Sequence, residues 1–362
     1  MKSLIFLSVL SLIFGCGKRD SAPDPVAPDL YFPPATGTWE TIPAATLGWD
    51  ESKISGLETF LETSNTRGFI ILKDGKIVME KYWGKMFDGT TDFSATSNWY
   101  WASAGKTLTS ATVGIAAFQG DLNLDARTSD YLGTGWTSLT LAQENKITLR
   151  HQLTMTTGLN DAVANRDCTE PSCMVYLAEP GTRWAYHNAP YTILDEVIEG
   201  GTGKSLNVFT QEVLLSKIGM NGTYIKIGDN NVFFSTPRSM ARFGLLLLGQ
   251  GRWAQEQIIT PSYMSLMQNP SQNFNFAYGY LTWLNGSPSY MIPTSQTVFP
   301  GAMSSNAPED MFAAIGKNGQ LINIVPSQNL VIIRMGDDPD NALVPFTFQD
   351  NLWEKLNAII TQ

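Results

Sequence analysis

The chain has 362 residues and a formal net charge of −9, and its composition is 43% hydrophobic and 16% charged. This length allows one large domain or two ordinary ones, and the hydrophobic share excludes a disordered chain because it supplies a sizeable core. The acidic balance and the lack of clustered basic residues argue against a nucleic-acid partner.

Residues 1–15 have the pattern of a targeting segment. Lys2 precedes an apolar run, LIFLSVLSLIF, which is too short to span a bilayer as a helix but suits the core of a signal peptide. The Gly-Cys pair that follows is similar to the cleavage site of a bacterial lipoprotein, and its cysteine is Cys16. We therefore predict an exported protein, in the periplasm or at the cell surface, lipid-anchored to a bacterial membrane through Cys16. The alternative is a conventional signal peptide with an incidental cysteine.

The next segment, residues 16–46, is rich in Pro, Ala and Asp, as in APDPVAPDLYFPPATG. Such a composition predicts a tether with polyproline character, long enough to hold a domain away from a membrane. The folded domain is then expected to occupy residues 47–362.

Strand-like and helix-like patterns follow one another along this domain. Asp50 is placed to cap a first helix, and two β-rich runs on either side of Asp74-Gly75 predict a hairpin. Residues from about 107 to 265 are mostly helix-forming, whereas short β-rich runs return near residue 278 and an amphipathic helix, FQDNLWEKLNAII, closes the chain. These patterns predict an α/β (α+β) fold: one antiparallel sheet made from both chain ends, flanked by helices, with a mostly helical inserted subdomain.

The first candidate for chemistry is the segment NWYWASAGKTLTS, in which Ser103 stands three residues before Lys106. Residues three apart on a helix share a face, and a helix N-terminus stabilises negative charge. A lysine acts as a base only if its pKa falls, and the aromatic run at 99–101 would supply the apolar pocket that lowers it. On this segment alone, a capping serine beside a solvated lysine is an equal alternative.

Two cysteines, Cys168 and Cys173, lie close together in the stretch DCTEPSC. In an oxidising compartment this spacing predicts a local disulfide, with two free thiols as the alternative. Such a short closed loop adds little to global stability, so its expected task is to shape the loop.

Two later segments complete a pattern. Tyr186-His187-Asn188 lies in a Pro- and Gly-containing loop before a helix, and MFAAIGKNGQLINIVPSQNLVIIRMG contains two strands joined by a Gly-rich turn. The turn residues Gly316, Lys317, Asn318 and Gly319 are candidates for substrate binding.

The order Ser-x-x-Lys, Tyr-x-Asn and Gly-containing strand resembles the serine β-lactamase and penicillin-binding protein superfamily. The segments LRHQLTMTTGL, PGTRWAYHNAPY and INIVPSQNLVIIRMG resemble sequences of its class C β-lactamase-related branch. That branch includes D-alanyl-D-alanine carboxypeptidases, carboxylesterases and 6-aminohexanoate-dimer hydrolases. The resemblance runs from about residue 47 to the C-terminus and implies a β-lactamase-like fold with no cofactor and no metal.

The resemblance also implies a role for each matching residue. Ser103 would be the acylated nucleophile, and Lys106 would take or relay its proton. Tyr186 would act as general base in acylation and as general acid toward the leaving group, which requires a lowered pKa. Asn188 would bind substrate and position Lys106. The backbone N–H of Ser103 and one near 316–317 would form the oxyanion hole.

The third segment departs from the pattern of β-lactamases, in which this strand carries Lys-Thr-Gly or a close variant. Here Asn318 stands in place of Thr, or the turn follows the G-x-x-G-Q pattern of the 6-aminohexanoate-dimer hydrolase and esterase branch. We prefer the second interpretation, in which Lys317 contributes its backbone to the site. Efficient β-lactam hydrolysis is then not expected.

Other catalytic sets have little support. The only two histidines are His151 and His187; His187 lies inside the Tyr-x-Asn motif with its side chain expected to face away from the nucleophile, and His151 is expected to pack or hydrogen-bond within a helix. The stretch GGTGKS at 200–205 lacks the frame of a phosphate-binding loop and is interpreted as a helix end.

We therefore expect an exported serine hydrolase that forms an acyl-enzyme on Ser103 and hydrolyses a small-molecule ester, amide or peptide. One alternative is a D-alanyl-D-alanine carboxypeptidase or weak β-lactamase acting on cell-wall peptides. A second alternative is a catalytically idle binding protein of the same fold.

Overall fold

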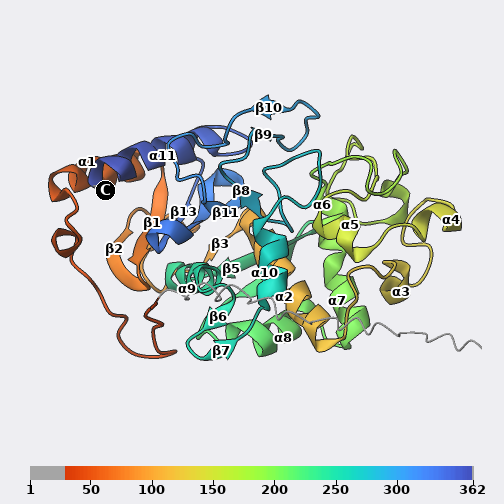
Figure 1. The fold of residues 1–362 in the computed structure, drawn as a ribbon, viewed down its shortest axis with the longest axis horizontal. Helices are drawn as coiled ribbons and strands as arrows, with labels where there is room; N and C mark the ends of the chain where they lie inside the picture. The colour runs from red at the N-terminus through yellow and green to blue at the C-terminus, as the bar shows by residue number, and fades with distance from the viewer. Residues whose placement is uncertain (1–28, 361–362) are drawn as a thin grey trace, which may run out of the picture.

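A computed structural model of the chain describes residues 29–360 (Figure 1). The predicted signal peptide and Cys16 lie outside the described residues. Within residues 29–360, no helix combines the length and apolar character needed to cross a membrane.

The largest element is a six-stranded antiparallel sheet that joins the two ends of the chain. Its strand order is β2-β1-β13-β12-β11-β8. The strands are β1 (Thr66–Lys73), β2 (Lys76–Tyr82), β8 (Trp283–Leu284), β11 (Phe312–Gly316), β12 (Gln320–Val325) and β13 (Leu330–Gly336). The central strands β11, β12 and β13 are buried throughout, so the sheet is covered on both faces. The predicted fold class is confirmed.

Helices cover the two faces of this sheet. Helix α1 (Ile54–Thr63) and the closing helix α11 (Phe346–Ile359) lie together on one face, where the rings of Phe60 and Phe348 stack with centroids 5.5 Å apart (Figure 1). Helix α9 (Pro237–Leu248) packs on the other face against β1, β12 and β13. The sheet residues therefore bury apolar side chains in both directions.

The predicted hairpin forms around Asp74 and Gly75, which join β1 to β2. Both residues have positive φ, 51° and 84°, as a tight hairpin turn requires. Asp50 accepts a hydrogen bond from the Ser52 backbone N–H and so caps the 3-10 turn Glu51–Lys53, which leads directly into α1.

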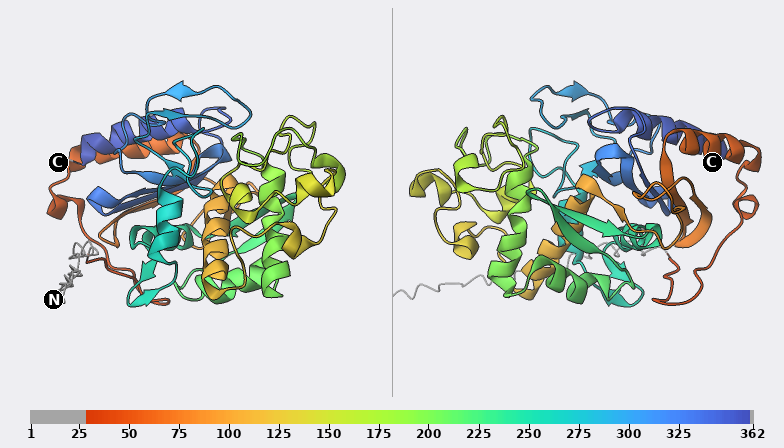
Figure 2. Two further views of the ribbon diagram at one scale, coloured as in Figure 1. Left: turned by 45° about the vertical axis from the view of Figure 1, so that its right-hand side comes forward. Right: turned by 180° about the vertical axis from the view of Figure 1, so that it is seen from behind.

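The middle of the chain forms a second, mostly helical part beside the sheet (Figure 2). Its elements are α2 (Gly105–Gln119), α3 (Ser129–Leu132), α4 (Leu141–Glu144), α5 (Leu149–Leu153), α6 (Asn188–Thr192), α7 (Leu194–Thr202), α8 (Leu206–Thr210) and α10 (Pro261–Gln268). Helix α2 is buried on all sides from Gly105 to Ala116, because it lies between this part and strand β11. Helix α2 therefore places the turn before it, Ala102–Ala104, at the boundary between the sheet and the helical part.

The predicted helical insert differs from the structure in two respects. Strands β4 (Thr223–Ile227) and β5 (Asn230–Ser235) form a hairpin within it, and β5 pairs with the short β3 (Trp99–Tyr100). Helix α9 belongs to the sheet rather than to the helical part, since it packs on β12 and β13.

The segment before α1 is not a free tether from residue 29 onward. Leu30 and Trp39 are buried, and the Trp39 indole N–H donates to the Gly75 carbonyl at 2.8 Å. Thr41 forms a parallel bridge with Ile77 on the edge strand β2, so the segment runs along the outer side of the sheet (Figure 2). Covering this edge satisfies backbone groups that would otherwise invite pairing with other chains. The folded part thus begins near Leu30 instead of near residue 47.

Candidate active site

Ser103 lies in a short 3-10 turn, Ala102–Ala104, between strand β3 and the buried helix α2. The residue before it, Ala102, has a φ of 47°, which is uncommon for a residue with a Cβ. A strained backbone conformation of this kind persists only where the surrounding packing holds it in place. Here the neighbouring Trp101 donates a 2.8 Å hydrogen bond to the Ser235 hydroxyl and meets the Phe233 ring edge-on. The turn therefore presents Ser103 at the N-terminus of α2, where negative charge is stabilised.

Lys106 lies one helical turn beyond Ser103 and faces it, as their spacing predicted. Its Nζ is 3.1 Å from the Ser103 Oγ, and the residue is only 4% exposed. No ion pair in the described part of the chain includes Lys106, and burial lowers its pKa to about 7, with Asp167 acting weakly in the opposite direction. A substantial share of Lys106 is therefore neutral near pH 7 and able to accept a proton from the serine.

The pocket around the Lys106 ammonium is aromatic, but its rings are not those expected. Nζ lies 4.3 Å from the ring centroid of Tyr191 and 5.1 Å from that of Tyr186. The run at 99–101 instead packs in the core: Trp101, for example, is fully buried and contacts Phe233 and Phe243.

Tyr186 is brought to Ser103 by the loop before α6. Its ring stacks on Trp283 at 5.9 Å and meets the edge of Tyr278 at 6.1 Å. Burial raises the pKa of Tyr186 above its usual value, and a hydrogen bond with Ser103 offsets only part of that effect. This shift is opposite to the one that a base role for Tyr186 requires. The neutral phenol can still donate a proton and receive another, so Lys106 is the better base and Tyr186 a better acid or relay.

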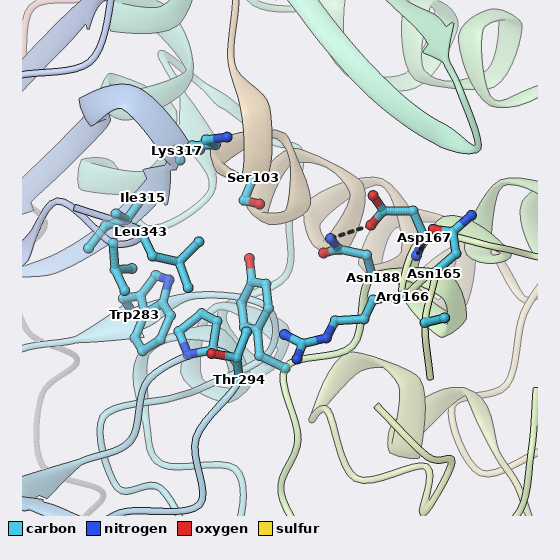
Figure 3. A pocket seen from close by; sticks show the side chains of 15 residues that line it. Ser103, Asn165, Arg166, Asp167, Asn188, Trp283, Thr294, Ile315, Lys317 and Leu343 are labelled. Atoms are coloured by element: carbon cyan, nitrogen blue, oxygen red, sulfur yellow. Dashed lines mark hydrogen bonds between the residues drawn. The ribbon is translucent and has the colours of Figure 1, made fainter. Parts of the chain in front are cut away.

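Asn188 is bonded differently from the expectation that it positions Lys106. Its Nδ2 donates to Asp167 Oδ1 at 2.7 Å, while its buried Oδ1 has no hydrogen-bond partner among the described residues (Figure 3). Asp167 directly precedes the Cys168–Cys173 disulfide, which is present in the structure. The disulfide loop thus holds the Asp167 side chain that orients Asn188.

The end of strand β11 lies against the turn that carries Ser103. A Cβ on Gly316 would come within 2.3 Å of the Trp101 carbonyl oxygen and 3.0 Å of the Ala104 backbone nitrogen, so only glycine fits here. This close approach brings the backbone at 316–317 beside Ser103, where a second oxyanion donor would have to lie.

The rest of the third segment turns away from the cavity. Asn318 has a φ of 63°, and its Nδ2 donates to the Tyr100 hydroxyl at 2.7 Å. The buried Arg334 guanidinium donates to the carbonyls of Asn318 and Gly319 and so holds the turn from behind. Asn318 and Gly319, proposed from the sequence as substrate contacts, do not line the cavity.

A cavity of about 430 Å³ opens in front of Ser103 (Figure 3). Among the residues that line it are Ser103, Arg166, Asp167, Tyr186, Asn188, Trp283, Thr294, Gly316, Lys317 and Leu343. A neighbouring cavity of about 220 Å³ reaches Lys106 on the other side of Ser103. The larger volume suits a small-molecule ligand, and the cavity has apolar walls with a few polar groups around the Ser103 hydroxyl.

The comparison with known families agrees with this arrangement. A family model described as Beta-lactamase matches residues 57–342. The chain belongs to the beta-lactamase family. No curated protein sequence matches it.

Several solved structures share the beta-lactamase-family fold with this chain. A protein assigned as a β-lactamase from Bacteroides dorei is 18% identical, with a TM-score of 0.66 over 87% of this chain and 100% of that one. A protein assigned as a 6-aminohexanoate-dimer hydrolase from Bacillus anthracis is 18% identical, with a TM-score of 0.64 over 91% and 89%. A penicillin-binding protein homologue from Caulobacter crescentus is 13% identical, with a TM-score of 0.64 over 84% and 97%. At these identities the likeness concerns the fold.

Within this beta-lactamase-family site, the histidines take no direct part. His151 caps the start of α5 through its Nδ1 and Thr148, as expected for a helix residue. His187 is 2% exposed, neither ring nitrogen has a partner in the described chain, and burial lowers its pKa to about 4. It is absent from the walls of the two cavities beside Ser103.

Four contributors to the site were not found from the sequence: Arg166, Asp167, Tyr191 and Trp283. Arg166 and Asp167 stand directly before Cys168, so the predicted disulfide loop was the one signal that pointed toward them. Nothing local marks Trp283, because its place in the cavity depends on the pairing of β8 with β11.

Proposed function

We propose that this chain is a serine hydrolase that forms an acyl-enzyme on Ser103 and hydrolyses an ester or amide bond of a small molecule. The observation that carries the proposal is the contact of Ser103 Oγ with the buried Nζ of Lys106, at 3.1 Å, inside a cavity of ligand size. A lysine with a pKa of about 7 can activate a serine at neutral pH, whereas a solvated lysine cannot.

Acylation begins with proton transfer from Ser103 to neutral Lys106. The Oγ then bonds to the substrate carbonyl carbon, and the carbonyl oxygen becomes an oxyanion. Backbone N–H groups of Ser103 and of the 316–317 segment, together with the N-terminus of α2, stabilise that charge.

Collapse of this intermediate breaks the bond to the leaving group. The Tyr186 hydroxyl gives its proton to the departing oxygen or nitrogen and regains one from protonated Lys106, which restores neutral lysine. Deacylation repeats the sequence with water: Lys106 accepts a proton from water, hydroxide adds to the acyl carbon, and Ser103 leaves as the alcohol after reprotonation.

Fold similarity to a protein assigned as a 6-aminohexanoate-dimer hydrolase supports an amidase or esterase. Similarity to a penicillin-binding protein homologue supports the second candidate, a D-alanyl-D-alanine carboxypeptidase or weak β-lactamase. The absence of a Lys-Thr-Gly motif at residues 317–319 favours the amidase or esterase.

A fluorophosphonate probe tests the nucleophile. We expect it to label the purified protein on Ser103 and to leave Ser103→Ala unlabelled, with Ser262→Ala, an exposed serine at the start of α10, as a matched control that still labels. Equal labelling of wild type and Ser103→Ala would refute the proposal. Short-chain nitrophenyl esters and nitrocefin, assayed side by side, separate an esterase from a β-lactamase.

We further propose that the protein is exported and held at a membrane by a lipid on Cys16. The apolar segment before Cys16 and the disulfide, which suits an oxidising compartment, support this. A Cys16→Ser protein is expected to leave the membrane fraction, and one that stays there would rule out this anchor.

A further inference from the structure

One cation in the cavity wall has no role in the chemistry described above. Arg166 is half-buried and lines the main cavity, yet its guanidinium forms no ion pair or hydrogen bond with any residue in 29–360. Figure 3 shows its side chain reaching from the side of Asn188 toward Thr294, with Lys317 on the other side of Ser103. An arginine in such a place normally pairs with a carboxylate. Without a partner, most of its five N–H donors make no hydrogen bond within the protein.

The backbone that carries Arg166 is anchored on three sides. The Arg166 carbonyl accepts from the Ala189 N–H in α6 at 3.1 Å, and Asn165 receives a bond from the Asp167 N–H at 3.1 Å while donating to Asp229 at 3.2 Å. The Cys168–Cys173 disulfide closes the loop immediately afterwards. A side chain that projects from a fixed backbone loses less entropy when it binds a ligand.

The charges of the cavity favour an anion. Its charged lining residues are Arg166, Lys317 and Asp167, and the Asp167 carboxylate already accepts a hydrogen bond from Asn188. The cavity wall is thus net positive in a chain whose formal net charge is −9. A positive cleft in an acidic protein concentrates anionic ligands at that place.

We propose that Arg166 is a specificity-determining residue that binds a carboxylate carried by the substrate, on the wall opposite Lys317. A guanidinium fork matches a carboxylate with two parallel hydrogen bonds, whereas a neutral ester or an ammonium group gains nothing from it. This inference rests on the proposed hydrolase and names its substrate class: acyl compounds with a carboxylate some distance from the scissile carbonyl.

Matched ester pairs test the proposal. In the acyl series, 4-nitrophenyl hexanoate is compared with the 4-nitrophenyl half-ester of adipic acid, which adds a terminal carboxylate to a chain of the same length. In the leaving-group series, phenyl acetate is compared with 4-carboxyphenyl acetate. The two series show which part of the substrate carries the anion, and the variants are Arg166→Gln, Arg166→Lys and Arg166→Glu.

We expect Arg166→Gln to lower kcat/KM for the carboxylate ester of at least one series by ~10–100-fold, mainly through KM, and to leave its neutral partner within about twofold. Arg166→Lys should retain part of the preference. Arg166→Glu should favour 4-nitrophenyl 6-aminohexanoate over the adipate half-ester. Lys226→Gln removes the same charge from an exposed position on β4 and should change neither ratio.

Unchanged discrimination in both series after Arg166→Gln would overturn the proposal. Because the Arg166 side chain has no protein partner in the described chain, the variants should melt within about 2 °C of wild type. Turnover of the neutral esters distinguishes failure of the hydrolase proposal from failure of the carboxylate-site proposal. Wild type that hydrolyses none of the esters refutes the hydrolase itself, whereas neutral-ester turnover without any effect of Arg166 refutes only the carboxylate site.

Discussion

Lys106→Met should abolish most activity and yet make the folded protein more stable at neutral pH. Lys106 is 4% exposed, and burial lowers its pKa from 10.5 to about 7. The lysine therefore gains a proton more readily in the unfolded chain than in the folded one, and each proton bound preferentially by the unfolded chain costs stability. Methionine has a similar length and never carries that charge.

The size of the effect follows from the two pKa values. Relative to a neutral side chain, Lys106 costs about 4 kcal/mol of folding free energy at pH 7 and about 2 kcal/mol at pH 9. Above pH 7 the folded state releases the Lys106 proton while the unfolded state keeps it, so the destabilising contribution of Lys106 shrinks as the pH rises toward about 10.5. The lost van der Waals packing of the lysine stem adds an offset that is independent of pH.

The assay is urea unfolding of wild type and Lys106→Met, followed by tryptophan fluorescence at several values between about pH 6 and about pH 9. All other titrating groups are common to both proteins, so their difference isolates Lys106. We expect the stability advantage of the variant to shrink by about 2 kcal/mol from pH 7 to pH 9. A difference that stays constant over this range would refute the depressed pKa and, with it, the base role of Lys106.

Four further outcomes are expected. For a neutral ester, kcat/KM should rise about tenfold per pH unit up to about pH 7 and then level off, because only neutral Lys106 accepts the proton, and a flat profile would contradict this. Tyr186→Phe should lower kcat by roughly 10²–10⁴-fold, and unchanged turnover would exclude it from proton transfer. Gly316→Ala should lower kcat about 100-fold by displacing β11 from the nucleophile turn, whereas Gly56→Ala, with nothing within 4 Å of its Cβ, should be silent. Arg334→Lys should cost about 2–4 kcal/mol in urea unfolding, because several buried carbonyls lose their donors, and a cost below about 1 kcal/mol would contradict that account.

Local patterns in the sequence were enough to predict the fold class and the contact between Ser103 and Lys106. The hairpin at Asp74-Gly75 and the amphipathic closing helix are signals contained within a few residues, and both formed as expected. The Ser103 and Lys106 pair needed only helical geometry, since three residues of spacing on α2 put both on one face.

Other features depend on partners far away in the chain. Strand β4 is mostly exposed and lies in an otherwise helical stretch of the sequence, and β3 pairs with β5 across more than a hundred residues of sequence. Leu30 and Trp39 lie in a Pro-rich stretch that resembles a linker, and only contact with the sheet edge shows that they are core residues.

The amino-acid sequence by itself determined which residues could carry the chemistry, because Ser-x-x-Lys and Tyr-x-Asn are defined by order and spacing. The tertiary structure decided what those residues can do. Burial beside two tyrosine rings lowers the pKa of Lys106, and burial raises the pKa of Tyr186 and so keeps its hydroxyl protonated. Folding also placed Arg166 in the cavity wall without a partner. Protonation and pairing depend on desolvation and on distance, which are properties of the packed chain rather than of any segment of it.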